Sequence, residues 1–447
     1  MTTRYAPHPA GNSSKISLIL RAFKYRNYRL FFSGQGISLI GTWMQNVAMG
    51  WLVYRLTGSA MLLGVVGFTA QFPTFVLSPL AGVAADRYDR RKILLITQAL
   101  AMAQALTLAF LVITGRVEVR HILALSFFLG LVNAFDIPAR QAFVVDLVEK
   151  KEDLANAIAL NSSMFNAARL LGPSIAGILI SVVGEGMCFL LNGLSYAAVL
   201  RSLWAINIRG RRKERPLEPV LKRFKEGFNY TFGFAPIKFI ILLLALASLT
   251  AMPYVVLMPV FVKEVLRGGP RTLGFLMACS GIGALTAALT LASRRSAAGL
   301  ESRIPAAGCV FGIGLIGLST ADSFPSAAAC IAVASFGMIT QMASCNTVIQ
   351  TLVDDDKRGR VMAFYALAFM GMAPFGSLLS GWAASRVGAP HAIMMSGFLA
   401  IAGAMAFLSR LREVREKARP VYERLGISAK IAEGLEAASE LTVPPED

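Results

Sequence analysis

The sequence predicts an all-α integral membrane protein with twelve transmembrane helices, arranged as two six-helix halves that repeat in parallel. Three observations predict this fold: the composition, the number of long apolar segments, and the distribution of charge between the loops. Of the 447 residues, 55% are hydrophobic and only 16% are charged, and the mean hydropathy is +0.59. A soluble domain carries about 25% charged residues. This composition excludes a soluble globule and a disordered chain, and the length with only five cysteines excludes a small disulfide scaffold.

Twelve apolar segments approach or exceed the roughly 20 residues that a transmembrane helix needs. The expected spans are 30–54, 60–84, 93–115, 121–143, 156–183, 187–207, 238–262, 272–293, 304–321, 325–350, 362–385 and 391–409. Of the 44 Lys and Arg residues, 35 lie in or beside the two tails and every second loop, and 7 lie in the other loops. By the positive-inside rule this bias predicts that both termini are cytoplasmic. It also accounts for the net charge of +18 without a nucleic-acid partner.

The polar interruptions divide the chain into five parts. These are a cytoplasmic amphipathic lead-in (1–29), an N-terminal six-helix half (30–206), a cytoplasmic basic linker (207–237), a C-terminal six-helix half (238–410) and a cytoplasmic tail (411–447). Within the linker, Leu221–Tyr230 is expected to form a short surface helix. A faint internal repeat matches Leu147–Asp153 and Pro173 to Leu352–Arg358 and Pro374, as two parallel copies of six spans would.

The loop between spans 2 and 3 carries the most specific motif. From Gly82 to Lys92 it reads GVAADRYDRRK, which resembles the signature G-x-x-x-D-R-x-G-R-R/K of the major facilitator superfamily. Span 5 contains RLLGPSIAG, with Gly172, Pro173 and Gly177, which resembles the Gly-Pro motif of antiporters in that family. With DIPARQ in span 4 and RGRV before span 11, these motifs resemble the branch that includes the enterobactin exporter. One position departs from the loop signature, where Asp stands in place of the second glycine.

The resemblance implies a secondary active transporter of a bacterial inner (cytoplasmic) membrane, in which spans 1, 4, 7 and 10 line a central cavity. In the family, the equivalent of Asp86 bonds to span 11 and the equivalent of Arg90 pairs with an acid on span 4. Asp136 is the only acid inside the predicted span 4. A gating latch is therefore expected at the cytoplasmic face, formed by Gly82, Asp86, Arg87, Arg90 and Asp136. The alternative is that these charges only hold the chain's orientation in the membrane.

Arg169 is a cation deep inside predicted span 5. If this span enters the bilayer near Ala157, the rise to Arg169 is about 18 Å through a core of about 30 Å. An ionisable residue at this depth predicts a functional site and a partner for the charge. The partner is expected to be Asp136, the substrate, or carbonyl groups near Pro173. A structural ion pair with no substrate role is the alternative.

Polar residues recur at helical spacing on the inner spans, which indicates faces that meet a cavity or a neighbouring helix instead of lipid. With Arg169, the expected substrate-cavity residues are Gln45, Asn46, Asn133, Tyr254, Gln341 and Asn346. Hydrogen bonding between helices is the alternative role of each. Asp136 is also the expected proton-coupling residue, because no other acid lies well inside a predicted span.

The leading functional prediction is a proton-coupled exporter, an antiporter that moves a lipophilic or amphipathic small molecule (siderophore or drug-like) by alternating access. A cavity rich in Met and aromatic residues suits such a molecule. A lipid or lysophospholipid flippase, or an uptake carrier of the same fold, is the alternative. No enzyme, cofactor or metal site is expected, because the sequence lacks P-loop, HExxH and GxSxG motifs. The expected partners are the substrate, protons and membrane lipids, and the expected state is a monomer.

Overall fold

The computed structural model describes residues 20–207, 220–293 and 299–424, and within these ranges all regular secondary structure is helical. Eleven helical segments in this part of the chain are long and apolar enough to cross a membrane. The remaining expected span is the 32-residue helix α2, which is more polar and carries Gln35, Gln45 and Asn46. The predicted all-α membrane fold is confirmed.

The helices form two bundles. The N-terminal bundle consists of η1 (Arg21–Lys24), α2 (Arg26–Thr57), α3 (Ala60–Arg87), α4 (Arg90–Ile113), α5 (Val119–Asp146), α6 (Lys151–Val183) and α7 (Glu185–Ala205). The C-terminal bundle consists of α8 (Val220–Gly233), α9 (Ala235–Thr250), η2 (Met252–Leu257), α10 (Met258–Glu264), α11 (Pro270–Ala292), α12 (Leu300–Ser319), α13 (Phe324–Leu352), α14 (Asp355–Met370), α15 (Ala373–Val387), α16 (Ala389–Ser409) and α17 (Leu411–Arg424).

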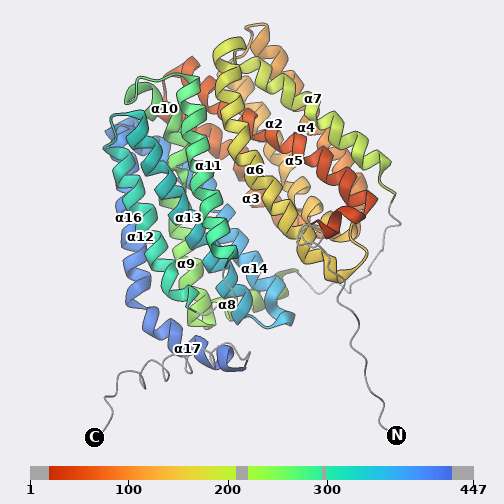
Figure 1. Cartoon of the computed structure of the whole chain (residues 1–447), viewed down its shortest axis with the longest axis vertical. Helices are drawn as coiled ribbons and strands as arrows, with labels where there is room; N and C mark the ends of the chain where they lie inside the picture. The colour runs from red at the N-terminus through yellow and green to blue at the C-terminus, as the bar shows by residue number, and fades with distance from the viewer. Residues whose placement is uncertain (1–19, 208–219, 294–298, 425–447) are drawn as a thin grey trace, which may run out of the picture.

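Figure 1 shows the bundles side by side, in contact at one end of the molecule and diverging toward the other. We call the end that holds η1 and α17 the terminal face, and the end where the bundles meet the opposite face. The most extensive contacts between the bundles are those of α6 with α11 and of α3 with α15. The fold therefore has its widest separation at the terminal face.

Two of the expected spans are broken instead of continuous. Span 7 consists of α9, the 3-10 helix η2 and α10, with Pro253 and Pro259 near the starts of η2 and α10. Span 11 consists of α14 and α15, which are separated at Gly371, and Pro374 lies in the first turn of α15. Proline has no N–H to continue the backbone hydrogen bonds of a helix, which explains why a helix restarts at each of these positions.

The bundles meet at the opposite face through two helix crossings that depend on glycine. Gly177 of α6 faces Gly274 of α11, where an added Cβ would lie 2.8 Å from the Gly177 Cα and 2.5 Å from the carbonyl oxygen of Pro173. Gly64 of α3 faces Gly381 of α15, where an added Cβ would also lie 2.8 Å from the Cα opposite. In a membrane, where apolar surface gives little drive for helices to associate, small residues allow this close backbone packing.

The two crossings are related by the internal repeat. Gly274 lies 210 positions after Gly64, and Gly381 lies 204 positions after Gly177. Each crossing therefore joins the second span of one six-helix copy to the fifth span of the other copy. By the 204-residue offset, Pro173 corresponds to Ser377, which contacts α3. The alignment that pairs Pro173 with Pro374 is therefore three residues out of register with the structural repeat.

Polar side chains also join the bundles at the opposite face. The Tyr54 hydroxyl of α2 donates to the Glu264 carboxylate of α10, and Lys263 Nζ lies 5.6 Å from the centre of the Tyr54 ring. Between α11 and α6, Arg271 Nε donates to Ser181 Oγ over 2.7 Å. Backbone contact and these polar pairs together close this face.

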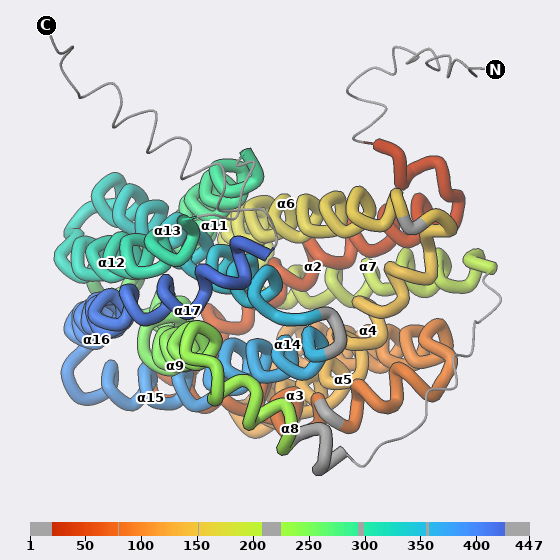
Figure 2. Tube along the Cα trace, turned by 90° about the horizontal axis from the view of Figure 1, so that it is seen from below, coloured from red at the N-terminus to blue at the C-terminus, as the bar shows by residue number. Residues whose placement is uncertain are grey.

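At the terminal face, each bundle is held by the segment that precedes its first long helix. Tyr25 donates its hydroxyl proton to Asp153 of α6 over 2.7 Å, and the same carboxylate raises the pKa of Lys24. In the C-terminal bundle, Arg360 of α14 pairs with Glu226 of α8 at 2.7 Å. Figure 2 shows α8 beside α14 in the view of this face. The fifth long helix of each bundle is thus fixed at its terminal end.

The surface helix expected at 221–230 is confirmed as part of α8. The tail expected after 410 begins with α17, which lies across the C-terminal bundle and buries Leu411, Val414 and Ala418 against it (Figure 2). The rest of the expected lead-in, linker and tail (1–19, 208–219 and 425–447) lies outside the described residues.

Gly274→Val is expected to weaken the closure of the opposite face. The added side chain meets the α6 backbone, and overpacking of this kind costs ~1–3 kcal/mol, which shifts the ratio of closed to open molecules by roughly 5- to 150-fold. The measurement is the yield of crosslinking between cysteines placed at Ser181 and Arg271, with the native cysteines replaced. Gly233→Val, at the end of α8, is the control, because a Cβ there meets nothing within 4 Å. An unchanged yield in Gly274→Val would contradict the proposed role of the crossing.

Candidate functional site

The loop Gly82–Lys92 joins α3 to α4 at the terminal face and also holds the end of α7. Asp89 caps α4, because its carboxylate accepts a hydrogen bond from the backbone N–H of Arg91 at 2.9 Å. Arg91 donates to the carbonyl oxygens of Leu203 and Trp204 at 2.7 and 2.8 Å. The residue that departs from the family signature is therefore the N-cap of α4.

Arg90 connects α3, α4 and α5. Its Nε donates to the Ala85 carbonyl oxygen at 3.0 Å, and its Nη1 pairs with Asp146 at 2.8 Å. Asp86 lies 3.7 Å from Arg90, and its side chain is 74% exposed. The expected pairing of Arg90 with Asp136 is wrong in this structure. The reason is that α5 continues three residues beyond the predicted end of span 4, which brings the carboxylate of Asp146 to Arg90.

Three of the expected latch residues, Gly82, Asp86 and Arg87, make few contacts at this face. Asp86 and Arg87 are exposed, and a Cβ on Gly82 would meet no atom within 4 Å. Because the bundles diverge here, no closed latch is formed among the described residues. The latch therefore stays a prediction for a state in which the terminal face is closed.

Asp136 is buried inside the N-terminal bundle, and both of its carboxylate oxygens are engaged. Oδ1 accepts hydrogen bonds from Thr97 Oγ1 at 2.9 Å and from Gln98 Nε2 at 2.7 Å. Oδ2 lies 3.2 Å from a guanidinium nitrogen of Arg140, one turn further along α5. The expected pairing of Asp136 with Arg169 is not formed, because α4 and the same helix already supply its partners.

Two of the expected cavity residues lie inside their own bundles. Gln45 donates to Gln104 at 3.3 Å and accepts from Asn192 at 2.8 Å. Gln341 packs against α12, where Gly308 leaves room for its amide group. For Gln45 and Gln341 the expected cavity position is thus wrong, because a polar row at helical spacing also suits hydrogen bonds within one bundle.

Of the other expected cavity residues, three are less enclosed and one is buried within the C-terminal bundle. Asn46 is exposed, and Asn133 and Asn346 are half-buried. Tyr254 is buried, and its hydroxyl lies 3.2 Å from Ser335 Oγ. A substrate role for these four residues remains a prediction.

Arg169 lies at the middle of α6, about 27 Å from its first residue and about 21 Å from its last at 1.5 Å per residue. Its Cζ lies 5.8 Å from the ring centre of Trp43, at the middle of α2. Gly172 allows this approach, since a Cβ there would lie 2.5 Å from the Trp43 Cβ. Among the described residues, Arg169 has no hydrogen bond and no salt bridge. A cation at mid-membrane costs ~2.5–3.5 kcal/mol or more, which a cation–π contact of about 0.5–2 kcal/mol does not fully offset.

Two rows of exposed residues run along α6 on different sides. The row near the opposite face is entirely apolar, as contact with lipid requires: Leu171, Ile175, Ile178 and Val182. The row toward the terminal face, which we call the inner row, comprises the exposed residues Ile158, Ser162 and Phe165 and ends at the half-buried Arg169. At about 100° per residue, the two rows are about 140° apart around the helix. The inner row therefore does not continue the lipid-facing side of α6.

The inner row lies next to the side of α6 that faces α11, about 105° away around the helix. Leu170 and Gly177 contact α11 near the opposite face, whereas Ala159 and Ser163, on the same side of α6, are exposed. Helices α6 and α11 therefore diverge toward the terminal face, as Figure 1 also shows. Toward the terminal face, this uncovered side of α6 and the neighbouring inner row form a strip of surface that ends near Arg169, which we call the open path.

Two residues that the structure places at the candidate site, Asp146 and Phe165, were not predicted from the sequence. Asp146 lay just outside the predicted span 4, and a longer estimate of that helix would have included it. Phe165 precedes Arg169 by four residues, so helical spacing places it on the same side. The sequence therefore contained the information needed to predict both residues.

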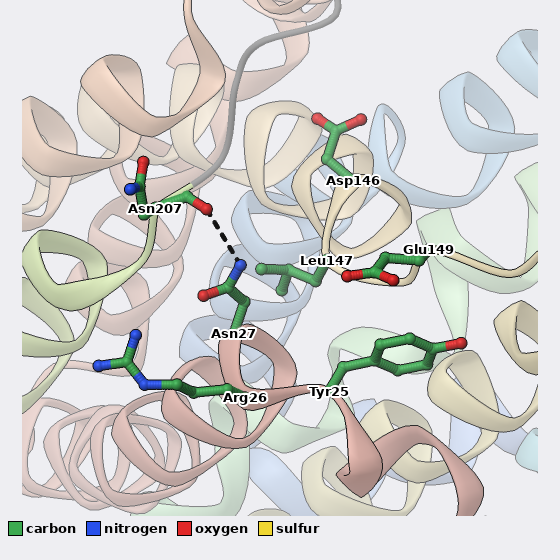
Figure 3. A pocket seen from close by; sticks show the side chains of 7 residues that line it. All are labelled: Tyr25, Arg26, Asn27, Asp146, Leu147, Glu149 and Asn207. Atoms are coloured by element: carbon green, nitrogen blue, oxygen red, sulfur yellow. Dashed lines mark hydrogen bonds between the residues drawn. The ribbon is translucent and has the colours of Figure 1, made fainter.

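A surface pocket of about 430 Å³ lies at the terminal face of the N-terminal bundle. Figure 3 shows its lining residues: Tyr25, Arg26, Asn27, Asp146, Leu147, Glu149 and Asn207. Asn27 donates to the Asn207 carbonyl oxygen at 3.2 Å. All of these residues belong to one bundle, so the pocket is not part of the space between the bundles. Among the described residues, no group of three His, Cys, Asp or Glu side chains is placed to hold a metal ion.

Comparison with known families and proteins identifies the architecture. The family model described as transmembrane secretion effector matches residues 19–433. The staphyloferrin A transporter of Staphylococcus aureus is 26% identical over 87% of this chain and 97% of its own length. The macrolide efflux protein A of Streptococcus pyogenes is 24% identical over 85% of this chain and 95% of its own length. The multidrug efflux pump Tap of Mycolicibacterium fortuitum is 24% identical, with coverages of 87% and 95%.

Solved transporter structures share the fold at low sequence identity. A bacterial homolog of the human lysosomal transporter Spinster, in an inward-facing and unoccupied conformation, superposes with a TM-score of 0.66 at 14% identity, over 92% of this chain and 99% of that one. A POT family transporter superposes with a TM-score of 0.70 at 11% identity, with coverages of 87% and 96%. Because this family model matches most of the chain, the chain belongs to the transmembrane secretion effector family of the major facilitator superfamily of membrane transporters.

Proposed function

We propose that the protein is an exporter of lipophilic or amphipathic small molecules, siderophore-like or drug-like, across a bacterial inner membrane. The observation that carries this proposal is the open side of α6, which leads from the terminal face to Arg169 while the opposite face is closed. The positive-inside rule makes the terminal face cytoplasmic. The described state is then the one in which an exporter loads its substrate from the cytoplasm. The named relatives, a siderophore transporter and two drug efflux proteins, support this choice of substrate class.

Transport by this proposal proceeds by alternating access. The glycine crossings at the opposite face separate, and the terminal ends of the bundles come together. Asp86 then meets the start of α14, where backbone N–H groups and the helix dipole favour an anion. Arg90, held by Asp146 and the end of α3, keeps Asp86 in position on the N-terminal bundle.

Proton coupling is proposed to use Asp136. It is a buried carboxylate in the membrane part of the chain, and Arg140 is the cation that competes with a proton for it. Protonation of Asp136 would release Arg140 and alter the contact between α4 and α5. This change is the proposed link between the proton gradient and the movement of the N-terminal bundle.

The direction of transport is tested with everted membrane vesicles, whose cytoplasmic face points outward, under opposite pH gradients. With the vesicle interior made acidic, vesicles that contain the protein are expected to accumulate pyrenebutyrate several-fold above vesicles without it. The same vesicles with an alkaline interior should show no such accumulation, because an antiporter moves its substrate against the direction of the proton. Accumulation only with an alkaline interior would identify a proton symporter, which is an uptake carrier, and refute export.

Asp136→Asn is expected to abolish the dependence of transport on the pH gradient. The amide cannot carry a proton, while its shape and its hydrogen bond from Thr97 remain possible. Counterflow without a gradient is compared with gradient-driven accumulation in proteoliposomes, and Asp322→Asn, an exposed loop acid, is the control. If the Asp136 variant still concentrates substrate against its gradient, Asp136 is not the proton carrier.

Asp86→Asn is expected to destabilise the state that is closed at the terminal face, and to slow turnover, without loss of folded protein. A neutral amide interacts less favourably than a carboxylate with the N-terminus of a helix, by ~0.3–1 kcal/mol or more. Crosslinking between cysteines at the terminal ends of α3 and α14 measures this state, with Glu149→Gln as the control on the same face. Unchanged crosslinking together with unchanged turnover would count against the latch.

A further inference from the structure

The inner row of α6 carries information about the kind of molecule that is transported. Arg169 is the only cation in this row, and among the described residues it has no carboxylate partner. Asp136, the acid that could neutralise it, is held by Arg140 and by two residues of α4. The positive charge at the end of the open path is therefore left for a group that is not part of the described protein.

Aromatic rings border this cation. The Arg169 guanidinium lies over the Trp43 ring, with 5.8 Å between Cζ and the ring centre. Trp43 contacts Phe165 edge to face, with 5.7 Å between ring centres, and Phe165 is 46% exposed. The same side of the path thus offers one charged group and an exposed apolar ring one helical turn away.

Three buried hydroxyl groups of the C-terminal bundle lie near the same point. Tyr254 lies within electrostatic range of Arg169. Its hydroxyl contacts Ser335 Oγ at 3.2 Å, which in turn contacts Ser280 Oγ at 2.7 Å. Gly281 of α11 packs against the backbone of Arg169 and Leu170. Neutral donors from one bundle and a guanidinium from the other therefore lie near the point where the bundles meet.

We propose that Arg169, Trp43 and Phe165 form an anion subsite, and that the transported molecule is an amphipathic organic anion. Its carboxylate or phosphate binds the guanidinium, whose fork geometry suits both groups. Its apolar part packs against Trp43 and Phe165 on the side of the open path. This proposal rests on the proposed export function, because it takes the inner row as the loading path. A cationic molecule would be repelled by Arg169, and a neutral one would leave its charge unpaired.

Three probes separate charge from shape. Pyrenebutyrate and pyrenebutanol share the same ring system and differ in charge, and lysophosphatidylglycerol carries the anion as a phosphate on a lipid. Binding of the two pyrene compounds is measured by fluorescence and by the rise in melting temperature of the purified protein in detergent, without a gradient. Lysophosphatidylglycerol is added as a competitor. The proteins compared are the wild type, Arg169→Gln, Arg169→Lys and the control Arg120→Gln, an exposed arginine in the first turn of α5 that pairs with Glu118.

The wild type and Arg120→Gln are expected to bind pyrenebutyrate about 10-fold or more tightly than pyrenebutanol, as a charge-assisted hydrogen bond allows. Arg169→Gln should bind both compounds about equally, with the pyrenebutanol affinity unchanged. Arg169→Lys should keep part of the preference, because it keeps the charge but loses the fork. If Arg169→Gln does not fold, Phe165→Ala offers a second variant, which should weaken both pyrene compounds by a similar factor.

Equal binding of the two pyrene compounds by the wild type, or no binding of either, would overturn the subsite. A preference for pyrenebutyrate that survives in Arg169→Gln would overturn it as well. Competition by lysophosphatidylglycerol that requires Arg169 supports the subsite with a phospholipid as the anion, and its absence beside selective pyrenebutyrate binding supports a free acid. Selective binding without accumulation in everted vesicles would refute export and leave the subsite standing. Accumulation without selectivity would refute the subsite alone.

Discussion

Backbone contact between two pairs of glycines determines how the two bundles are placed. At Gly64–Gly381 and Gly177–Gly274, no side chain separates the helices, so the bundles are closest at the opposite face. Straight helices that cross near one end must diverge toward the other, which leaves Ala159 and Ser163 uncovered on the inner part of α6. Arg169 lies about two turns from the Gly177 crossing. The cation therefore lies where the open path ends and the closed region begins.

A second set of contacts makes the N-terminal bundle behave as one body. Asp89, Arg90 and Arg91 join the ends of α3, α4, α5 and α7 through helix caps, carbonyl contacts and the pair with Asp146. These bonds lie at the terminal face, where the two bundles do not support each other. The loop sequence thus has a structural role in the open state in addition to any role in closing that face. Asp86 of this loop is exposed, and it is the acid that does not cap a helix and can meet a partner on the other bundle.

Hydropathy, charge asymmetry and residue counting predicted the membrane fold and the depth of Arg169, because each of these properties acts along a single helix. They did not predict the partners of Arg90, Gln45 or Gln341. Those partners depend on where a helix ends and on its rotation about its own axis, which neighbouring helices decide. A longer α5 placed Asp146 beside Arg90, and packing within each bundle turned the two glutamines away from the space between the bundles. The prolines of spans 7 and 11 were a local signal for the helix breaks. The continuous hydropathy of each span concealed that signal.

The side chains that bound the open path and the residues that close the opposite face belong to different turns of the same helix. On α6, Ile158 to Arg169 would meet the transported molecule, while Gly177 meets only backbone. Substitutions in the first group would change which compounds are recognised, and substitutions in the second would change how often the protein cycles. Selectivity and turnover can thus evolve separately within one helix. The relatives named above handle compounds as different as siderophores and macrolides. Such a family can diversify its recognition surface in this way while the glycine crossings between the bundles stay fixed.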